Sequence, residues 1–212
     1  MASKSRNQQS TNQAEPTAEP TVEPDTAPTE PQVFDDFGGC LDLALNLISA
    51  SDEPGLALEF GVSTGRTLQA IAAAMPAGSR VLGFDSFQGL PENWREGFPA
   101  GMFRASPPEI PGTELVIGLY ADTLPSWEPD EVDPAIALVH IDCDLYSSTK
   151  TVLEHVGLHL EPGCLIVFDE FHSYPGAERH EAKAWAEWID ETGTEFTVLA
   201  RGPEQLLVRL GA

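Results

Sequence analysis

The sequence predicts an α/β fold, in which helices cover both faces of a mostly parallel β-sheet. The first observation is that short apolar runs of strand length alternate along the chain with segments of helical periodicity. The second is the stretch LALEFGVSTGRT at 56–67, which has the pattern of a strand, a tight glycine turn and a helix start. The third is that several predicted strands end in an acidic residue. Parallel strands share one carboxyl edge, so we expect a ligand site there.

The individual elements follow from periodicity and from breaks at Gly and Pro. In chain order, the sequence predicts a helix at 33–50, a strand at 56–60, a helix opening at Thr67, strands at 80–84 and 114–117, a short helix within 118–127, a strand at 135–141, a helix at 147–160, a strand at 164–168, a helix at 177–191, and strands at 196–199 and 206–210. The last two strands are close enough in sequence to form an antiparallel hairpin. The segment 86–112 is rich in Pro and Gly yet carries aromatic side chains, which predicts a lid or a substrate wall.

Composition limits the domain organisation and the classes of partner. Residues 1–31 repeat Glu-Pro and Thr with almost no large apolar side chain, so we expect a disordered tail before one domain at 32–212. A formal charge of −23 argues against binding to nucleic acid or to an anionic membrane. The sequence has no apolar run long enough to span a membrane, no apolar signal region, and three cysteines without metal-ligand spacing. We therefore expect a reduced, cytoplasmic protein.

The glycine turn favours one class of nucleotide-like ligand. Gly61 and Gly65 are four residues apart with Ser63 between them, whereas a dinucleotide fingerprint requires the pattern G-x-G-x-x-G. Glu59 stands just before the turn, where it would repel a phosphate and suit the cationic groups of S-adenosylmethionine. Asp85, at the tip of the second strand, is placed to bind ribose hydroxyls. The alternatives are an ordinary strand-to-helix turn with a surface Glu, and a capping role for Asp85.

Acidic residues at the strand ends predict a metal site. Asp142 follows one strongly apolar strand, and Asp169 and Glu170 follow the next. Carboxylates gathered at one edge would repel one another without a cation, and oxygen ligands of this kind suit Mg²⁺ or Mn²⁺. Asp144 is expected to matter less than Asp142, because it starts the following loop. The alternative is that these acids cap helices and face solvent.

Histidines offer further candidates for acid–base chemistry. His172 and His180 follow the acidic pair and lie beside the predicted metal site in sequence. Either could take a proton from a substrate hydroxyl, and a structural role is the alternative for each. His140 lies inside an apolar strand and is expected to be a core residue, while His155 and His159 are expected to be surface or packing residues of a helix.

Several stretches of the sequence form a specific combination. They are LEFGVSTGRT, GFDSFQGLPENW, HIDCDLYSSTKTVLE and PGCLIVFDEFHSYPG, followed by His180-Glu181. Over roughly residues 33–210, the combination resembles the class I S-adenosylmethionine-dependent methyltransferases, and within them the macrocin O-methyltransferase family. The resemblance implies a Rossmann-like fold with a seven-stranded, mostly parallel sheet whose last strand is antiparallel. It implies cofactor contacts at Glu59, Gly61, Ser63, Gly65, Asp85 and Asp122.

The same resemblance implies a metal site and its ligands. In metal-dependent relatives the matching positions are Asp142, Asp169 and Glu170, where Glu170 departs from the more usual Asp. Leu145 stands where catechol-type relatives carry a lysine, so no lysine base is expected. Asp142, His172 and His180 are then the candidate catalytic residues.

Together these observations predict an enzyme. We expect an S-adenosylmethionine-dependent O-methyltransferase that, with the help of Mg²⁺, methylates a hydroxyl of a small-molecule acceptor such as a sugar or a natural product. Nucleic acid and membranes are not expected as partners, and a homodimer is one assembly that the sequence leaves open. The alternatives are a nicotinamide-dependent oxidoreductase, which the missing middle glycine disfavours, and a non-catalytic nucleotide-binding module that keeps the fold without the activity.

Overall fold

A computed structural model describes residues 30–211, so the tail predicted at 1–31 lies almost entirely outside the described residues. The strands are β1 (Gln32–Val33), β2 (Leu56–Phe60), β3 (Arg80–Asp85), β4 (Glu114–Ile117), β5 (Ile136–Ile141), β6 (Leu165–Phe168), β7 (Phe196–Arg201) and β8 (Leu206–Leu210). The α-helices are α1 (Gly39–Ser51), α2 (Arg66–Ala74), α3 (Tyr120–Thr123), α4 (Tyr146–Val156) and α5 (Glu181–Thr192). Short 3₁₀ turns form η1 (Leu124–Ser126), η2 (Gly157–His159) and η3 (Ala177–Arg179).

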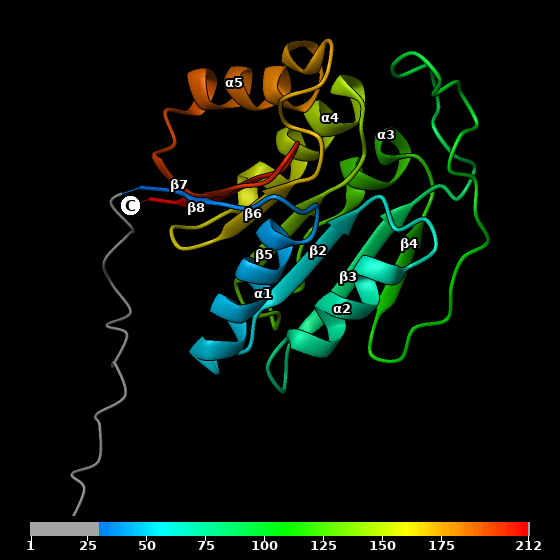
Figure 1. Ribbon diagram of the computed structural model, residues 1–212. Coiled ribbons are helices and arrows are strands. Elements are labelled where there is room, and N and C mark those ends of the chain that lie inside the picture. Colours follow the sequence, from blue (N-terminus) through cyan, green and yellow to red (C-terminus); the bar gives the residue numbers. More distant parts are fainter. Residues whose placement is uncertain (1–29, 212) are drawn as a thin grey trace, which may run out of the picture.

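The sheet lies between two layers of helices (Figure 1). In α1 the buried residues Cys40, Ala44 and Ile48 recur every four positions, which puts them on one face of the helix. This face packs with α2 against one side of the sheet. α4 and α5 cover the other side, where Val152 and Trp185 join the larger core cluster. The central strands are buried on both faces, as expected for parallel strands between helices.

The strand order is β1-β7-β8-β6-β5-β2-β3-β4, and the neighbours pair in parallel except at β8. β8 is antiparallel to both β6 and β7, and it forms the predicted hairpin with β7. The predicted Rossmann-like sheet with an antiparallel last strand is therefore confirmed. The short β1, which pairs with β7, adds one strand to the seven that were predicted.

Two helices start later than their sequence patterns predict. The helix predicted at 33–50 begins at Gly39, because the preceding residues run as β1 alongside β7 and then turn. The helix predicted at 177–191 is divided into η3 and α5 at His180, whose φ of −111° and ψ of −122° are not helical. Both differences come from contacts with distant parts of the chain, which a helical pattern does not reveal.

The strand order fixes where a ligand can bind. After β2 the chain adds β3 and β4 on one side of it, and then β5 and β6 on the other. A crevice forms at the carboxyl ends where the order reverses, between β2 and β5. Among residues 30–211, the helices are all too short or too polar to cross a membrane.

Candidate functional site

A cavity of about 630 Å³ opens at this reversal point. Its wall combines the glycine turn after β2, the tip of β3, the segment after β4, the start of α4 and parts of the long segment at 86–112. The predicted site residues that line it are Gly61, Ser63, Asp85, Asp142 and Glu170. The predicted cofactor turn and part of the predicted metal site therefore share one cavity.

The turn after β2 runs very close to the end of β5. Gly61 has a φ of +103°, and a Cβ at this position would collide with the carbonyl oxygen of Asp142. Its amide donates a hydrogen bond of 3.0 Å to the carbonyl of Phe84, which ties the turn to β3. Gly65 also has a positive φ, of 80°, but it is buried against Pro108 and does not line the cavity. Glycine is needed at both positions because a side chain would clash or strain the backbone.

Asp85 supports the turn and faces the cavity. Its Oδ2 accepts a hydrogen bond of 2.8 Å from the amide of Ser63, and its Oδ1 accepts one of 2.7 Å from the amide of Phe87. Each carboxylate oxygen can accept a second hydrogen bond. Asp85 can therefore bind hydroxyl groups of a ligand without releasing the turn.

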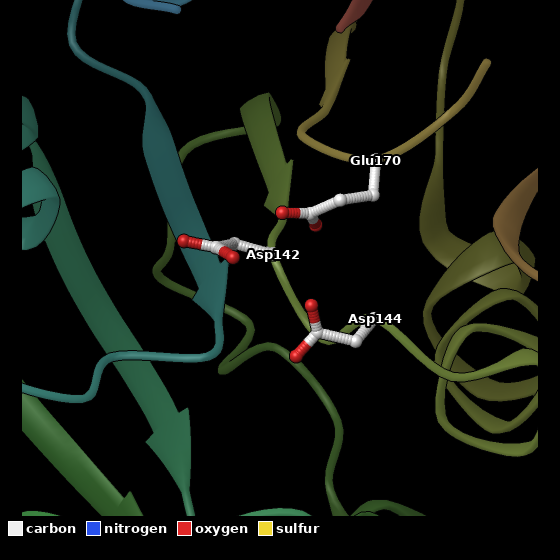
Figure 2. A group of neighbouring side chains, drawn as sticks. All are labelled: Asp142, Asp144 and Glu170. Atoms are coloured by element: carbon white, nitrogen blue, oxygen red, sulfur yellow. The ribbon is translucent and has the colours of Figure 1, made fainter. Parts of the chain in front are cut away.

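Three carboxylates converge on another part of the wall (Figure 2). Asp142 and Asp144 follow β5, and Glu170 follows β6. One oxygen of each lies within 4.8 Å of those of the other two. Asp144 has a φ of +63°, so the chain turns sharply where this side chain joins the group. We call Asp142, Asp144 and Glu170 the acid cluster.

Burial and mutual repulsion disfavour full ionisation of the acid cluster. Burial, followed by the charge of Asp169, raises the pKa of Asp142 well above its usual range and that of Asp144 to about 7. Burial, followed by the charges of Asp142 and Asp144, raises the pKa of Glu170 in the same way. Across residues 30–211 none of the three forms an ion pair. A bound cation would relieve this repulsion.

The donor atoms of the acid cluster fit a hard divalent cation. All three side chains offer carboxylate oxygens, which are the ligands that Mg²⁺ and Mn²⁺ prefer. Oε2 of Glu170 is buried and has no hydrogen-bond partner within the described part of the chain. Coordination would satisfy such an atom, which is otherwise costly to bury.

The acid cluster differs from the predicted ligand set in one member. Asp169 points elsewhere, since its Oδ1 and its backbone carbonyl accept hydrogen bonds of 3.2 and 2.9 Å from Nε2 of Gln205. Asp144, expected to matter less than Asp142, joins the group in its place. Asp169 still lies near enough for its charge to raise the pKa of Asp142 and Asp144.

Glu59 is paired inside the sheet and does not line the cavity. Its Oε1 lies 2.9 Å from Nδ1 of His140 on β5, and both side chains are buried. Burial lowers the pKa of His140, but the hydrogen bond and charge of Glu59 outweigh it and raise that pKa to about 9. The pair therefore ties β2 to β5. Asp122 is exposed on α3 and also lies off the wall, next to Ala121, which lines it.

The two predicted histidine bases also lie off the cavity wall. Nδ1 of His180 lies 3.3 Å from Nε1 of Trp94 and 3.0 Å from the hydroxyl of Tyr174. The indole can only donate, so this nitrogen is an acceptor and the ring is held neutral at that position. Nδ1 of His172 lies 2.6 Å from the hydroxyl of Ser173. Burial is the main cause that lowers the pKa of both histidines.

Hydroxyl groups on α4 line the cavity and were not predicted. Ser147, Ser148 and Thr151 lie on the first two turns of this helix. Residues four apart share a helix face, so the spacing of Ser147 and Thr151 directly after the acidic strand end was a usable signal. Arg66, at the start of α2, adds a positive charge to the wall. No local pattern marked that residue.

Comparison with known proteins places the chain in a family. The methyltransferase domain family matches residues 58–171, more than half of the chain. An 8-demethyl-8-(2,3-dimethoxy-alpha-L-rhamnosyl)-tetracenomycin-C 4'-O-methyltransferase from Streptomyces olivaceus is 27% identical over an alignment of 152 residues that covers 62% of this chain and 58% of that relative. The chain therefore spans less than two thirds of the length of this relative.

Solved structures agree with the family match. The calicheamicin methyltransferase CalS11 has a TM-score of 0.64 and 25% sequence identity, over 80% of this chain and 78% of that chain. The O-methyltransferase NovP has a TM-score of 0.60 at 19% identity, over 83% of this chain and 78% of that chain, and it shows the fold alone. The family match contains both the glycine turn and the acid cluster. The chain therefore belongs to the methyltransferase domain family, within the class I S-adenosylmethionine-dependent methyltransferases.

Proposed function

We propose that this protein is an O-methyltransferase that moves the methyl group of S-adenosylmethionine to a hydroxyl of a natural product, with Mg²⁺ assisting. Family membership supports the methyl donor. The acceptor is supported by relatives: the Streptomyces olivaceus enzyme is named for a rhamnosyl tetracenomycin, and CalS11 is described as a TDP-rhamnose 3'-O-methyltransferase at 27% identity. We therefore favour a hydroxyl of a deoxysugar as the methylated group.

The observation that carries this proposal is that the glycine turn, Asp85 and the acid cluster line the same cavity. A donor held at the turn and an acceptor held at the acid cluster would meet inside it. Methyl transfer is an in-line displacement, so the main contribution of a protein is to position the two reactants.

The donor end of the cavity is built by the turn after β2 and the segment after β4. The glycine turn lets a ligand approach the backbone and the start of α2 closely. Asp85 would accept hydrogen bonds from the ribose hydroxyls. Leu119 and Tyr120 offer an apolar surface for a flat ring such as adenine.

The acceptor end is built by the acid cluster and the hydroxyl groups of α4. Asp142, Asp144 and Glu170 would hold the cation, which when bound lowers the pKa of a hydroxyl group. Ser147 and Thr151 lie on the same wall and can donate to or accept from neighbouring hydroxyls of a sugar ring.

A carboxylate of the acid cluster is the proton acceptor that we favour. Asp142, Asp144 and Glu170 line the wall that an acceptor hydroxyl held at the acid cluster would face, so a proton acceptor is present there. His172 and His180, which the sequence also predicts, lie off the wall. They would need a movement of the chain to reach a bound hydroxyl.

The test is transfer of an isotopically labelled methyl group from S-adenosylmethionine to a panel of acceptors. The panel contains TDP-rhamnose, a rhamnosylated aromatic polyketide and a catechol, each with Mg²⁺ and after exhaustive EDTA treatment. We expect label on a sugar hydroxyl, loss of transfer with EDTA, and calorimetric binding of S-adenosylmethionine but not of NAD in both conditions.

A different result would contradict each part of the proposal. Tight binding of NAD in place of S-adenosylmethionine would overturn the methyl donor. Binding of S-adenosylmethionine without transfer to any sugar of the panel would contradict the acceptor class and favour a non-catalytic module. Full activity after EDTA treatment, with no metal by elemental analysis, would remove Mg²⁺ from the mechanism.

A further inference from the structure

Glu181 is a fully buried carboxylate beside the acid cluster, and the proposed reaction does not use it. It is the first residue of α5, and its exposed fraction is 0%. Its Oε2 accepts a hydrogen bond of 3.2 Å from the backbone amide of Glu170. Its Oε1 is buried and has no hydrogen-bond partner among the described residues. Burial of such an unsatisfied oxygen is costly, so packing alone does not account for a glutamate here.

The surroundings of Glu181 are acidic and disfavour its ionisation in the absence of a cation. Burial, followed by the charges of Asp144, Asp169 and Asp142, raises the pKa of Glu181 well above its usual range. The charge of Glu181 acts in the same direction on Glu170. Glu181 forms no ion pair within residues 30–211. A cation bound at the acid cluster would relieve this repulsion and favour the ionised form of Glu181.

We propose that Glu181 is a positioning residue of the cation site: it fixes the backbone of Glu170 and adds negative charge behind the acid cluster, which strengthens the binding of a divalent cation. This inference rests on the metal part of the proposed function. Glu181 is not one of the three converging carboxylates, so it acts through Glu170 and through its charge. A buried charge acts strongly at short range, because the protein interior screens it less than water does.

The hydrogen bond to Glu170 gives this role a geometric basis. Glu181 accepts a hydrogen bond from the backbone amide of Glu170, and the side chain of Glu170 lines the cavity. Groups that hold metal ligands in place typically change metal affinity about 10–100-fold when they are removed. A cation at the acid cluster would offset part of the electrostatic cost of burying Glu181, whose Oε1 has no hydrogen-bond partner among the described residues.

The test compares two substitutions of Glu181 with a matched control. Glu181→Gln keeps the size and an acceptor for the Glu170 amide but removes the charge, and Glu181→Met removes both. Glu178→Gln removes the same charge from an exposed side chain three residues earlier. Mn²⁺ binding is measured by calorimetry on the full chain without acceptor. We expect about 10–100-fold weaker binding in both Glu181 variants and wild-type affinity in the control.

Thermal unfolding gives a second readout that does not depend on catalysis. Because Glu181→Gln removes a buried carboxyl group whose ionised form would be unpaired, its metal-free Tm should equal or exceed that of the wild type. The rise in Tm on adding Mn²⁺ should be smaller in this variant, since the rise follows the affinity for the cation. Binding of S-adenosylmethionine should stay unchanged, which shows that the fold is intact.

The outcomes separate this inference from the function on which it rests. A lower metal-free Tm for Glu181→Gln with wild-type Mn²⁺ affinity would show a purely structural role and overturn the inference alone. The Gln variant decides the matter even if Glu181→Met does not fold. Failure of the wild type to bind Mn²⁺ would overturn the metal part of the proposed function and this inference with it.

Discussion

Asp85 holds the turn after β2 and at the same time faces the cavity. Its two oxygens accept hydrogen bonds from the amides of Ser63 and Phe87, so this side chain keeps the wall in shape before any ligand binds. A ligand hydroxyl that bonds to Asp85 therefore meets an acceptor that is already oriented. Such preorganisation lowers the ordering cost of binding.

We predict that Asp85→Asn weakens the binding of S-adenosylmethionine about 10–100-fold. Asparagine keeps the shape but loses the charge, and hydrogen bonds to charged groups contribute about 1.5–3 kcal/mol. Calorimetry measures the effect, and Asp122→Asn is the control, because Asp122 is exposed and lies off the wall. Equal affinities for Asp85→Asn and the wild type would contradict the ribose role.

Paired and unpaired acids behave differently at this sheet edge. Glu59 has His140 as a buried partner, so its charge is balanced within the protein. Asp142 and Asp144 follow the same strand as His140 but have no such partner among the described residues. The pairing of Glu59 explains why an acid just before the glycine turn need not contact the ligand.

At the scale of elements, the segment at 86–104 is docked against the body of the domain. The guanidinium of Arg95 lies 4.0 Å from the ring centre of Trp94 and 4.4 Å from that of Tyr174. Its NH1 also lies 3.2 Å from a carboxylate oxygen of Glu204, in the turn between β7 and β8. Leu90 and Phe103 of the same segment line the cavity. The segment predicted as a lid or a substrate wall is therefore held against the domain by Arg95, whose guanidinium contacts aromatic rings and Glu204.

We predict that Arg95→Met loosens this segment. Methionine keeps the apolar stem of the side chain but loses the ion pair with Glu204 and the cation–π contacts. Each cation–π contact is worth about 0.5–2 kcal/mol. Hydrogen exchange measured by mass spectrometry should be faster across 90–102 in this variant. Arg104→Met, on an exposed arginine of the same segment, should exchange like the wild type. Equal exchange in both variants would rule out the docking role of Arg95.

The sequence predicts the strands of the central sheet because each is an apolar run. The structure buries these runs on both faces. β1 escapes prediction because its two residues are exposed and carry no pattern. Asp144 takes the place predicted for Asp169 in the acid cluster. This depends on the positive φ of Asp144 and on Gln205, a distant residue that binds Asp169. The docking of Arg95 likewise depends on residues far along the chain. Sequence patterns therefore locate the site but do not settle which acids meet in it.

At the scale of the whole molecule, buried titrating groups link stability to pH. The folded-state pKa of Asp144 is about 7 against a usual 3.8, so the native state binds more protons between these values and stability falls as pH rises. His140, raised from 6.5 to about 9, stabilises fully below 6.5 and loses that effect as pH rises through 9. His172 and His180, whose pKa values are lowered, act in the opposite direction near 6.5.

We predict that the Tm of the metal-free protein falls on the order of 5 °C between about pH 5.5 and about pH 8. The groups whose pKa is raised, in the acid cluster and at His140, outnumber the two histidines whose pKa is lowered. The Tm should therefore fall as the pH rises. Saturating Mg²⁺ should reduce the fall, because the cation replaces the protons that the acid cluster otherwise binds. Scanning calorimetry with and without Mg²⁺, and with Asp144→Asn as the variant, measures this. A metal-free Tm that rises with pH would contradict it.

The position of β8 has a consequence for how the protein is made. β8 follows every other strand in the chain, yet it lies inside the sheet between β6 and β7. While the ribosome is still producing residues 206–210, one edge of β6 and one of β7 lack their partner. Unpaired strand edges invite pairing with other chains. The nascent protein therefore passes through a stage at which it is most prone to aggregate, and this stage ends only when β8 is inserted.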